Sequence, residues 1–166
     1  GSGNKMHNLF EDVLNDYSKE RTKKLTKDNK MAKHLTDVIP KKIKTKDIIN
    51  PKQYEVKGSA GIAATWTHTP WVAIFFFFLT NTAQKGYYIV YLFRKDMSGF
   101  YLSLNQGWTF FKKNYSSPKD EIKKATIFFR KLLNDSFSSF STDIDLKAST
   151  GSSKGYELGH ICGKFY

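Results

Sequence analysis

Two short patterns bring together side chains that are known from metal sites. Glu55-Val56-Lys57, with Asp47 upstream, imitates the acidic-x-Lys half of a metal-dependent nuclease site, where carboxylates hold the cation and lysine stabilises developing charge. A three-residue pattern is weak in a chain with 27 lysines and arginines, and no second acidic residue stands nearby in a strand pattern. Asp120-Glu121-Ile122-Lys123 lies in a helical pattern and is weaker still. The sequence therefore does not favour an active nuclease.

His160-Ile161-Cys162 is the second pattern, and it would place two potential ligands on the same face of a strand. A zinc site needs three or four ligands, and the other histidines, His7, His34 and His68, have no recognisable spacing. Cys162 has no identifiable base that would make it a nucleophile. Phosphate-binding loops, dinucleotide fingerprints and nucleophile elbows are missing from the sequence. We therefore expect no catalytic residues, no metal ligands and no enzyme activity in this chain.

Aromatic residues interleaved with basic ones remain as candidates for binding. They are Trp66, His68, Trp71, Tyr87, Tyr88, Tyr91, Arg94 and Lys95. Flat side chains beside cations suit the stacking of an unpaired or extruded base, which is worth about 1–3 kcal/mol per base. The competing interpretation is that the rings belong to the core. It is favoured for Tyr91 and Phe93, and both interpretations stay open for Trp71 and Tyr88.

Charge points to an anionic partner. The formal net charge is +12, from 27 Lys+Arg against 15 Asp+Glu. Positive charges in such excess repel one another in a compact chain, and an anionic partner relieves that repulsion. Nucleic acid is therefore the first candidate partner and an anionic membrane surface the second. The excess is mostly lysine, so solvated faces of a lysine-rich protein are the third interpretation.

The length of 166 residues suits one domain. Its single cysteine excludes an internal disulfide framework and fits a cytoplasmic location. The N-terminus has no secretory signal. Gly1-Ser2-Gly3 is typical of an expression remnant, so we assign residues 1–5 to a disordered start and residues 6–166 to the domain.

Two helices are predicted before residue 54. Apolar residues at helical spacing predict an amphipathic helix over residues 7–20. A second, short helix over residues 31–39 is expected to end at Pro40. A basic connection over residues 41–53 follows.

Strand patterns dominate from Tyr54 onward. Residues 54–57 alternate like a strand, and the small residues 58–61 predict a loop. The apolar run Trp71–Leu79 has nine residues, whereas a membrane-spanning helix needs about 20, so it is interpreted as a strand covered on both faces, with Trp71 at its start. Residues 86–93 and 100–105 predict a hairpin around a turn at 95–99.

The last third of the chain predicts one helix that opens at Pro118, with an apolar stripe through Ile122, Ala125, Phe129 and Leu132-Leu133. A loop is expected over 136–141, a strand over 144–148, a turn over 150–154 and a strand over 156–166. The predicted fold is therefore α+β: a single domain with a mixed or antiparallel central β-sheet and flanking helices.

Three longer segments resemble the McrB-like N-terminal domain family: Pro70–Phe75, Thr82–Phe93 and Asp96–Gly107. Val56–Ser59 and Gly159–Ile161, with Lys164 and Tyr166, are similar to further segments of that family, so the resemblance covers about residues 7–166. It implies the DNA-reading domain of a modification-dependent restriction system, which flips a methylated cytosine from duplex DNA into an aromatic pocket.

The resemblance also implies parts that lie outside this chain. A GTP-driven AAA+ motor would follow the domain, and a partner nuclease subunit would cut the DNA. GTP and Mg²⁺ are then expected only for the motor, and no cofactor for this domain. The domain alone is expected to be a monomer in the cytoplasm without a membrane partner.

Carried over residue by residue, the resemblance implies a base pocket with Trp71, Tyr88 and Leu92. Tyr88, Ser103 and Asn105 are plausible hydrogen-bonding partners of the base edge. The loop before Pro70 corresponds to the part that enters the DNA groove, so Ile62, Ala63, Ala64 and Trp66 are the groove candidates. Ala63, at the aligned position, is too small to fill the gap left by a flipped base, so Ile62 or Trp66 would take that role, unless the flipping geometry differs.

Lysines of residues 19–57 and the Arg94-Lys95 pair are expected to contact phosphate. The individual candidates are Lys41, Lys42, Lys44, Lys57, Arg94 and Lys95. The modified base stays open between 5-methylcytosine, hydroxymethylcytosine, N4-methylcytosine and a methylated adenine.

Two other functions remain open. The aromatic residues could form an open platform for RNA or another single strand, or the chain could be a protein-interaction module that docks a motor or nuclease through Phe76-Phe77-Phe78.

Overall fold

A five-stranded antiparallel β-sheet forms the centre of the molecule, in a computed structural model that describes residues 2–133 and 139–166. Each strand pairs with its neighbour in the sequence, in the order β1-β2-β3-β4-β5. The strands are β1 (Tyr54–Ile62), β2 (Thr65–Phe76), β3 (Tyr87–Phe93), β4 (Phe100–Gln106) and β5 (Cys162–Phe165). The predicted α+β fold is therefore confirmed, and the sheet is antiparallel throughout.

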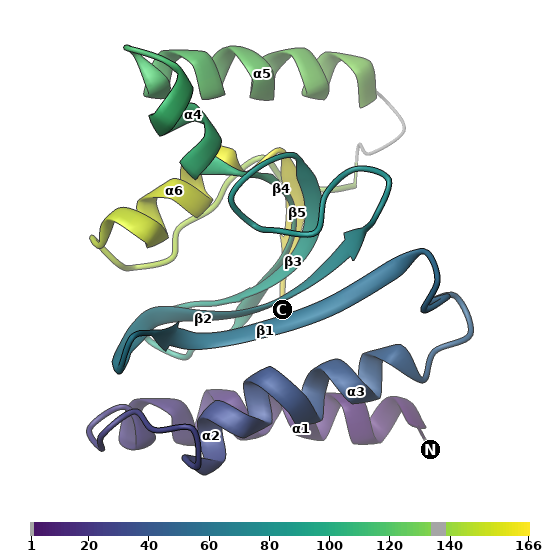
Figure 1. Ribbon diagram of the computed structural model, residues 1–166, viewed down its shortest axis with the longest axis vertical. Helices are drawn as coiled ribbons and strands as arrows, with labels where there is room; N and C mark the ends of the chain where they lie inside the picture. The colour runs from purple at the N-terminus through teal and green to yellow at the C-terminus, as the bar shows by residue number, and fades with distance from the viewer. Residues whose placement is uncertain (1, 134–138) are drawn as a thin grey trace.

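Helices lie in two groups on opposite sides of the sheet (Figure 1). The first group is α1 (Ser2–Glu20), α2 (Lys30–Lys33), the π-helix η1 (His34–Val38) and α3 (Ile39–Lys44). The second group is α4 (Trp108–Asn114), α5 (Pro118–Leu133) and α6 (Gly151–Gly159). None of the described helices combines the length and the apolar character that crossing a membrane requires.

Alternating residues of β2 face the two groups of helices. Val72 belongs to the core cluster that also contains Val13, Tyr17 and Leu35 from the first group. Ala73 and Phe75 belong to a second cluster with residues of β3 and with Leu146. Because side chains alternate along a strand, Trp71 lies on the same side as this second cluster and faces α6.

The first predicted helix is confirmed, and α1 begins at Ser2 instead of residue 7. The expected helix end at Pro40 is wrong, because helical structure continues from Lys30 to Lys44. Pro40 is the second residue of α3, and the π-helix that precedes α3 ends two residues before it, at Val38.

The loop expected at residues 58–61 belongs to β1. Added to Gly58, a Cβ atom would overlap the backbone carbonyl of Leu35, so glycine allows the strand to pass close to η1. The chain turns instead at Ala63 and Ala64, whose φ angles of 50° and 67° are typical of a two-residue hairpin turn. The β1–β2 hairpin therefore projects further than the sequence indicated.

The phenylalanine run is only partly a core strand. β2 begins at Thr65 and ends at Phe76, so Trp71 lies in its middle and not at its start. Pro70 lies in the stretch where the pairing with β1 shifts, which is where a strand tolerates proline. Phe75 is fully buried, whereas Phe77, Phe78 and Leu79 follow the strand and are exposed.

The C-terminal elements differ most from the prediction. Residues 144–148 form no strand, although Leu146 is fully buried and accepts a hydrogen bond from the N–H of Lys95. The expected turn and strand over 150–159 are α6, and α4 was not predicted. Three glycines within α6 hide its helical character in the sequence, but Gly155 lets the helix pack directly against Trp108.

The helix that opens at Pro118 is confirmed as α5, but its predicted apolar stripe is only partly buried. Ile122 is fully buried and Leu132 is exposed. Of the loop predicted for residues 136–141, the part at 136–138 lies outside the described residues.

Candidate functional site

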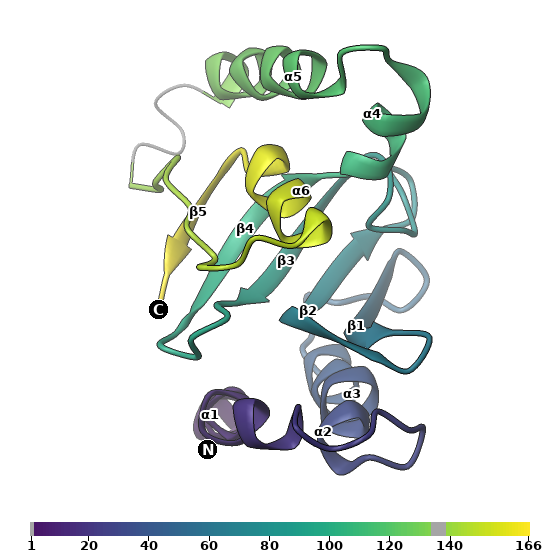
Figure 2. The ribbon, with the colours of Figure 1, turned by 90° about the vertical axis from the view of Figure 1, so that its left-hand side faces the viewer.

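A cavity of about 590 Å³ lies beside the middle of β2. Its walls come from the β1–β2 hairpin, the connection after β2, α4 and the start of α6. In Figure 2, the hairpin and α6 lie on the side of the molecule that faces the viewer. The volume is within the range of about 300–1,000 Å³ that is typical of small-molecule sites.

Trp71 and Tyr156 are aromatic residues that both line this cavity and pack against each other. Trp71 is half-buried and lies between Ser59 of β1 and Leu92 of β3 in the sheet register. Its ring centroid is 6.4 Å from that of Tyr156 in α6, and the ring planes are inclined by 58°. Burial raises the pKa of the Tyr156 hydroxyl, and a hydrogen bond from Trp71 lowers it by a smaller amount. The hydroxyl therefore stays protonated at neutral pH.

Tyr156 was not predicted as a site residue, because its segment was interpreted as a strand. Only the packing of α6 on the sheet brings its ring to Trp71, 85 positions earlier in the chain. The aromatic character of the residue was the one signal in the sequence.

Tyr88 lines the cavity as well, and Leu92 does not. The Tyr88 side chain is almost fully buried, and its hydroxyl donates a hydrogen bond to the carbonyl of Ala83 at 3.1 Å. Burial also raises the pKa of this hydroxyl well above its ordinary value. Leu92 is fully buried in the cluster beneath Trp71 and supports that ring from below.

Ser103 and Asn105 are fully buried and do not line the cavity. The Asn105 amide donates to the Ser103 hydroxyl at 3.1 Å and to the carbonyl of Tyr156 at 2.9 Å. Ser103 in turn pairs with Nδ1 of His160 at 2.6 Å. Both residues therefore hold α6 in place through Tyr156 and His160.

Gln106 and His68 supply polar atoms that lack partners. Both residues line the cavity, and Oε1 of Gln106 and Nδ1 of His68 are buried without a hydrogen-bond partner in the described part of the chain. The Thr126 hydroxyl donates its proton to the carbonyl of Ile122, so it can only accept from Gln106. The Gln106 amide nitrogen therefore faces Thr126, and Oε1 is left as the free acceptor. Burial first, and then Arg21 and Lys95, lower the pKa of His68, so the ring is neutral at neutral pH.

The tip of the β1–β2 hairpin lies at the cavity. Gly61, Ile62 and Thr65 line it, and Ile62 is 79% exposed. Trp66 also lines the cavity, but its indole N–H donates to the carbonyl of Lys23 at 2.8 Å and its ring packs edge-on against Tyr17. Of the two candidate gap fillers, Ile62 therefore has a side chain that can insert into a duplex, whereas the Trp66 side chain is held by its contacts with Lys23 and Tyr17.

Among the predicted phosphate contacts, Lys57 lines the cavity and donates to the carbonyl of Asn81 at 3.1 Å. Lys112, which was not predicted, lines it from α4. The lysines of α3, Lys41, Lys42 and Lys44, lie with the first group of helices on the other side of the sheet.

Arg94 and Lys95 follow β3, at the end of the sheet where β2 begins. Arg94 pairs with Asp96 at 3.4 Å. Lys95 lies near enough to His68 to lower the pKa of that ring.

Within residues 2–133 and 139–166, no group of three or more His, Cys, Asp or Glu side chains could hold a metal ion.

Comparison with known proteins identifies the family. No curated protein and no solved structure matches the chain. The sequence model of one family, described as MrcB-like, N-terminal domain, matches residues 12–166, which run from α1 to the end of β5. The chain therefore belongs to the MrcB-like N-terminal domain family.

Proposed function

We propose that this chain is the specificity domain of a modification-dependent restriction system and binds a modified base that has been flipped out of duplex DNA. The observation that carries this proposal is the half-buried ring of Trp71, which lines a cavity of about 590 Å³ beside Tyr156. Family membership is consistent with DNA binding in restriction systems. The net charge of +12 favours an anionic partner.

Stacking energies are of the size that base flipping requires. Unstacking and unpairing a base costs a few kcal/mol, and stacking on an aromatic side chain returns about 1–3 kcal/mol. Trp71 is well suited to this role because β2 is hydrogen-bonded on both sides and holds the ring in one place.

The rings of Trp71 and Tyr156 must separate and become parallel to hold a base between them. A base in contact with both faces requires parallel rings about 7–8 Å apart, which is twice the optimal carbon–carbon distance. The rings of Trp71 and Tyr156 are 6.4 Å apart and inclined. Since Trp71 sits on a central strand, we expect Tyr156 to move away with α6 and its ring to turn until it is parallel to Trp71 when the base enters.

Selectivity for the modification needs more than a methyl contact, which is worth about 0.8 kcal/mol. The free acceptor Oε1 of Gln106 is a candidate partner for the exocyclic amine of a cytosine or adenine base. A methylated cytosine is the ligand we favour, and the domain would bind it without cofactor and without catalysis. GTP, Mg²⁺ and a nuclease subunit would act through parts outside this chain.

Ile62 is the residue that we expect to fill the space left in the duplex. Replacing Ile62 by alanine removes the exposed apolar side chain at the hairpin tip, and affinity for the modified duplex should fall about 5- to 20-fold, because an unfilled gap leaves the flipped state without its support. Fluorescence anisotropy with labelled duplexes measures this change.

Ala63→Gly is the matched control at the same hairpin. Glycine relieves the positive φ of Ala63 and removes only a methyl group, so this variant should bind as the wild type does and unfold at the same or a higher temperature. Equal losses in both variants would assign the effect to the shape of the hairpin and exclude Ile62 as the gap filler.

A panel of labelled oligonucleotides tests the proposed function directly. We expect the wild-type chain to bind duplexes with one modified cytosine more tightly than the same duplex without modification, and more tightly than either single strand. If single-stranded DNA or RNA binds most tightly, the proposal of base flipping is wrong and the aromatic residues form an open stacking platform.

A protein-interaction module is the second candidate function, and one observation favours it. Phe77, Phe78 and Leu79 are 45%, 87% and 54% exposed, and these adjacent apolar side chains could dock a motor or nuclease subunit. This function alone predicts no measurable nucleic-acid binding at moderate salt, so the same panel distinguishes it from the first.

A further inference from the structure

The connection between α1 and α2, together with the first residue of α2, is densely basic. Residues 21–30, with the sequence RTKKLTKDNK, contain five cationic side chains and one acidic side chain. We call these residues the basic segment. Lys23, Lys24 and Lys27 are exposed within it.

Hydrogen bonds fix the basic segment in place. The indole N–H of Trp66 donates to the carbonyl of Lys23 at 2.8 Å, which ties the segment to the start of β2. The amide of Asn29 donates to Glu20 at 3.2 Å, and its side-chain oxygen accepts from the N–H of Ala32, which caps α2. The segment therefore has a defined position, although most of it is neither helix nor strand.

This position is at the cavity end of the molecule. The connection from α1 to α2, the tip of the β1–β2 hairpin and the start of α6 lie at the same end in Figure 1, and Figure 2 faces that end. Arg21 lies near enough to His68, which lines the cavity, to lower the pKa of its ring. The basic segment thus borders the site into which a base would flip.

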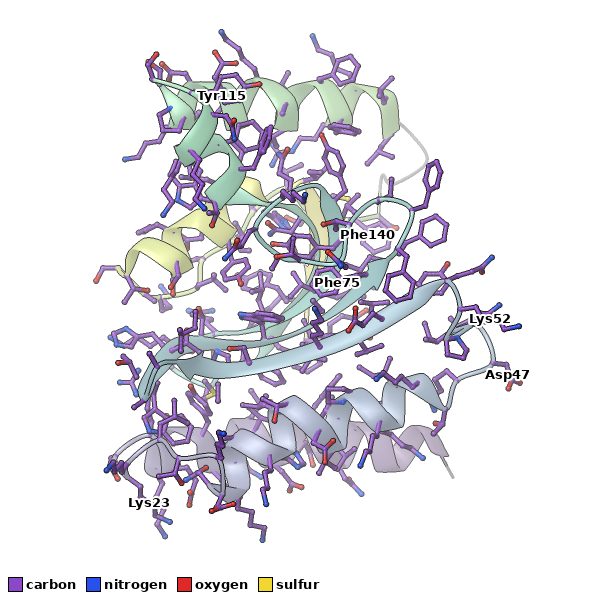
Figure 3. The ribbon with its side chains drawn as sticks, in the orientation of Figure 1. Lys23, Asp47, Lys52, Phe75, Tyr115 and Phe140 are labelled. Carbon is purple, nitrogen blue, oxygen red and sulfur yellow. The ribbon has the colours of Figure 1, made fainter. Side chains whose placement is uncertain are left out.

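The lysines of α3 lie elsewhere. Figure 3 shows Lys23 at one end of the molecule and Asp47 and Lys52, which follow α3, at the opposite end. The side chain of Lys41 also pairs with Asp37 at 3.4 Å. A duplex bound over the cavity would therefore meet the basic segment before it could reach α3.

Charges on the basic segment are largely available to a ligand. Lys23 pairs with Glu20 at 2.6 Å, and Asp28 lies 3.7 Å from Lys33 of α2. Within the described residues, no acidic side chain lies within ion-pair distance of Lys24 or Lys27. Exposed lysines beside a base-sized cavity are the arrangement expected for contacts to a phosphate backbone.

We propose that the basic segment binds the phosphate backbone of the duplex next to the flipped base, and that it supplies more of the salt-dependent affinity than α3 does. This inference rests on the proposed function, since it requires a duplex over the cavity. Backbone contacts do not read the modification, so the segment would strengthen the binding of modified and plain duplexes equally.

Two triple variants that remove equal charge test the inference. The first is Lys23→Gln, Lys24→Gln and Lys27→Gln, and the second is Lys41→Gln, Lys42→Gln and Lys44→Gln. For each, the dissociation constants of modified and plain duplex are measured over a series of salt concentrations, with thermal unfolding as the check on folding. Each phosphate contact that is lost lowers the slope of log K against log salt by about 0.9.

The first triple variant should lower this slope by about 2, whereas the second should lower it by less than about 1. Both should keep the wild-type ratio of affinities for modified and plain duplex.

Equal slopes in the two triple variants, or a larger loss from α3, would overturn the inference. A wild-type chain that does not distinguish modified from plain duplex would instead refute the proposed function, and the slopes would still decide which lysines contact DNA. The two failures are therefore distinguishable in one set of titrations.

Discussion

Replacing Trp71 by alanine is expected to abolish the preference for modified over plain duplex. Loss of one stacking face removes about 1–3 kcal/mol, which corresponds to a decrease of about 5- to 150-fold in affinity for the modified duplex. Plain duplex should bind almost as before, because its contacts are to the backbone. Anisotropy titrations of the two matched duplexes measure the ratio.

Two further variants separate the role of the ring from its contribution to folding. Trp71 is half-buried beside a core cluster, so its removal will also lower stability, and Trp71→Phe should restore packing and part of the preference. Phe78→Ala removes a ring that is 87% exposed and does not line the cavity, so it should leave the ratio unchanged. A folded Trp71→Ala protein with the wild-type ratio would exclude Trp71 from the base site.

Acid is expected to destabilise the fold through His160. This side chain is 1% exposed, with Nδ1 2.6 Å from the Ser103 hydroxyl and Nε2 3.2 Å from the carbonyl of Ser141. The carbonyl can only accept, so Nε2 carries the proton and Nδ1 accepts from Ser103. Burial lowers the pKa of His160 to about 4.

The direction of the pH effect follows from this lowered pKa. An unfolded histidine has a pKa of about 6.5, so the unfolded chain binds a proton between pH 6.5 and 4 that the folded chain does not bind. Stability is therefore complete above about pH 6.5 and falls by about 3 kcal/mol as the pH decreases to about 4. Urea unfolding at a series of pH values measures this loss.

His160→Gln is the comparison that isolates the histidine from the carboxylates that also titrate in acid. Glutamine keeps hydrogen-bonding atoms but cannot titrate, so the variant should be less stable than the wild type at pH 7 and should lose less stability between pH 6.5 and 4. The same loss in both proteins would mean that His160 does not control the acid response.

Sequence periodicity correctly predicted the elements that have a clear apolar pattern of their own. β3, β4 and α5 follow from their own apolar patterns, and the α+β class follows from their order. α6 could not be predicted because its glycines lower helix propensity, and only its packing against Trp108 and the sheet compensates. Pro40 likewise follows a π-helix, which no local pattern indicated.

Site residues were predictable only in part, for the same reason. Trp71 and Tyr88, which the aromatic pattern and the family resemblance marked as pocket candidates, line the cavity. Tyr156, Gln106 and Lys23 join the site region through contacts between distant segments, such as the bond from Trp66 to the carbonyl of Lys23. A single sequence does not reveal which of its many lysines share an end of the molecule with the cavity.

The structure of the domain bound to a duplex with one modified cytosine tests the central claim most directly. The account predicts that the modified base lies outside the helix, with its ring about 3.5–4.0 Å from the indole of Trp71 and Tyr156 on its other side. A modified base that stays paired within the duplex, above a cavity that holds no base, would contradict it.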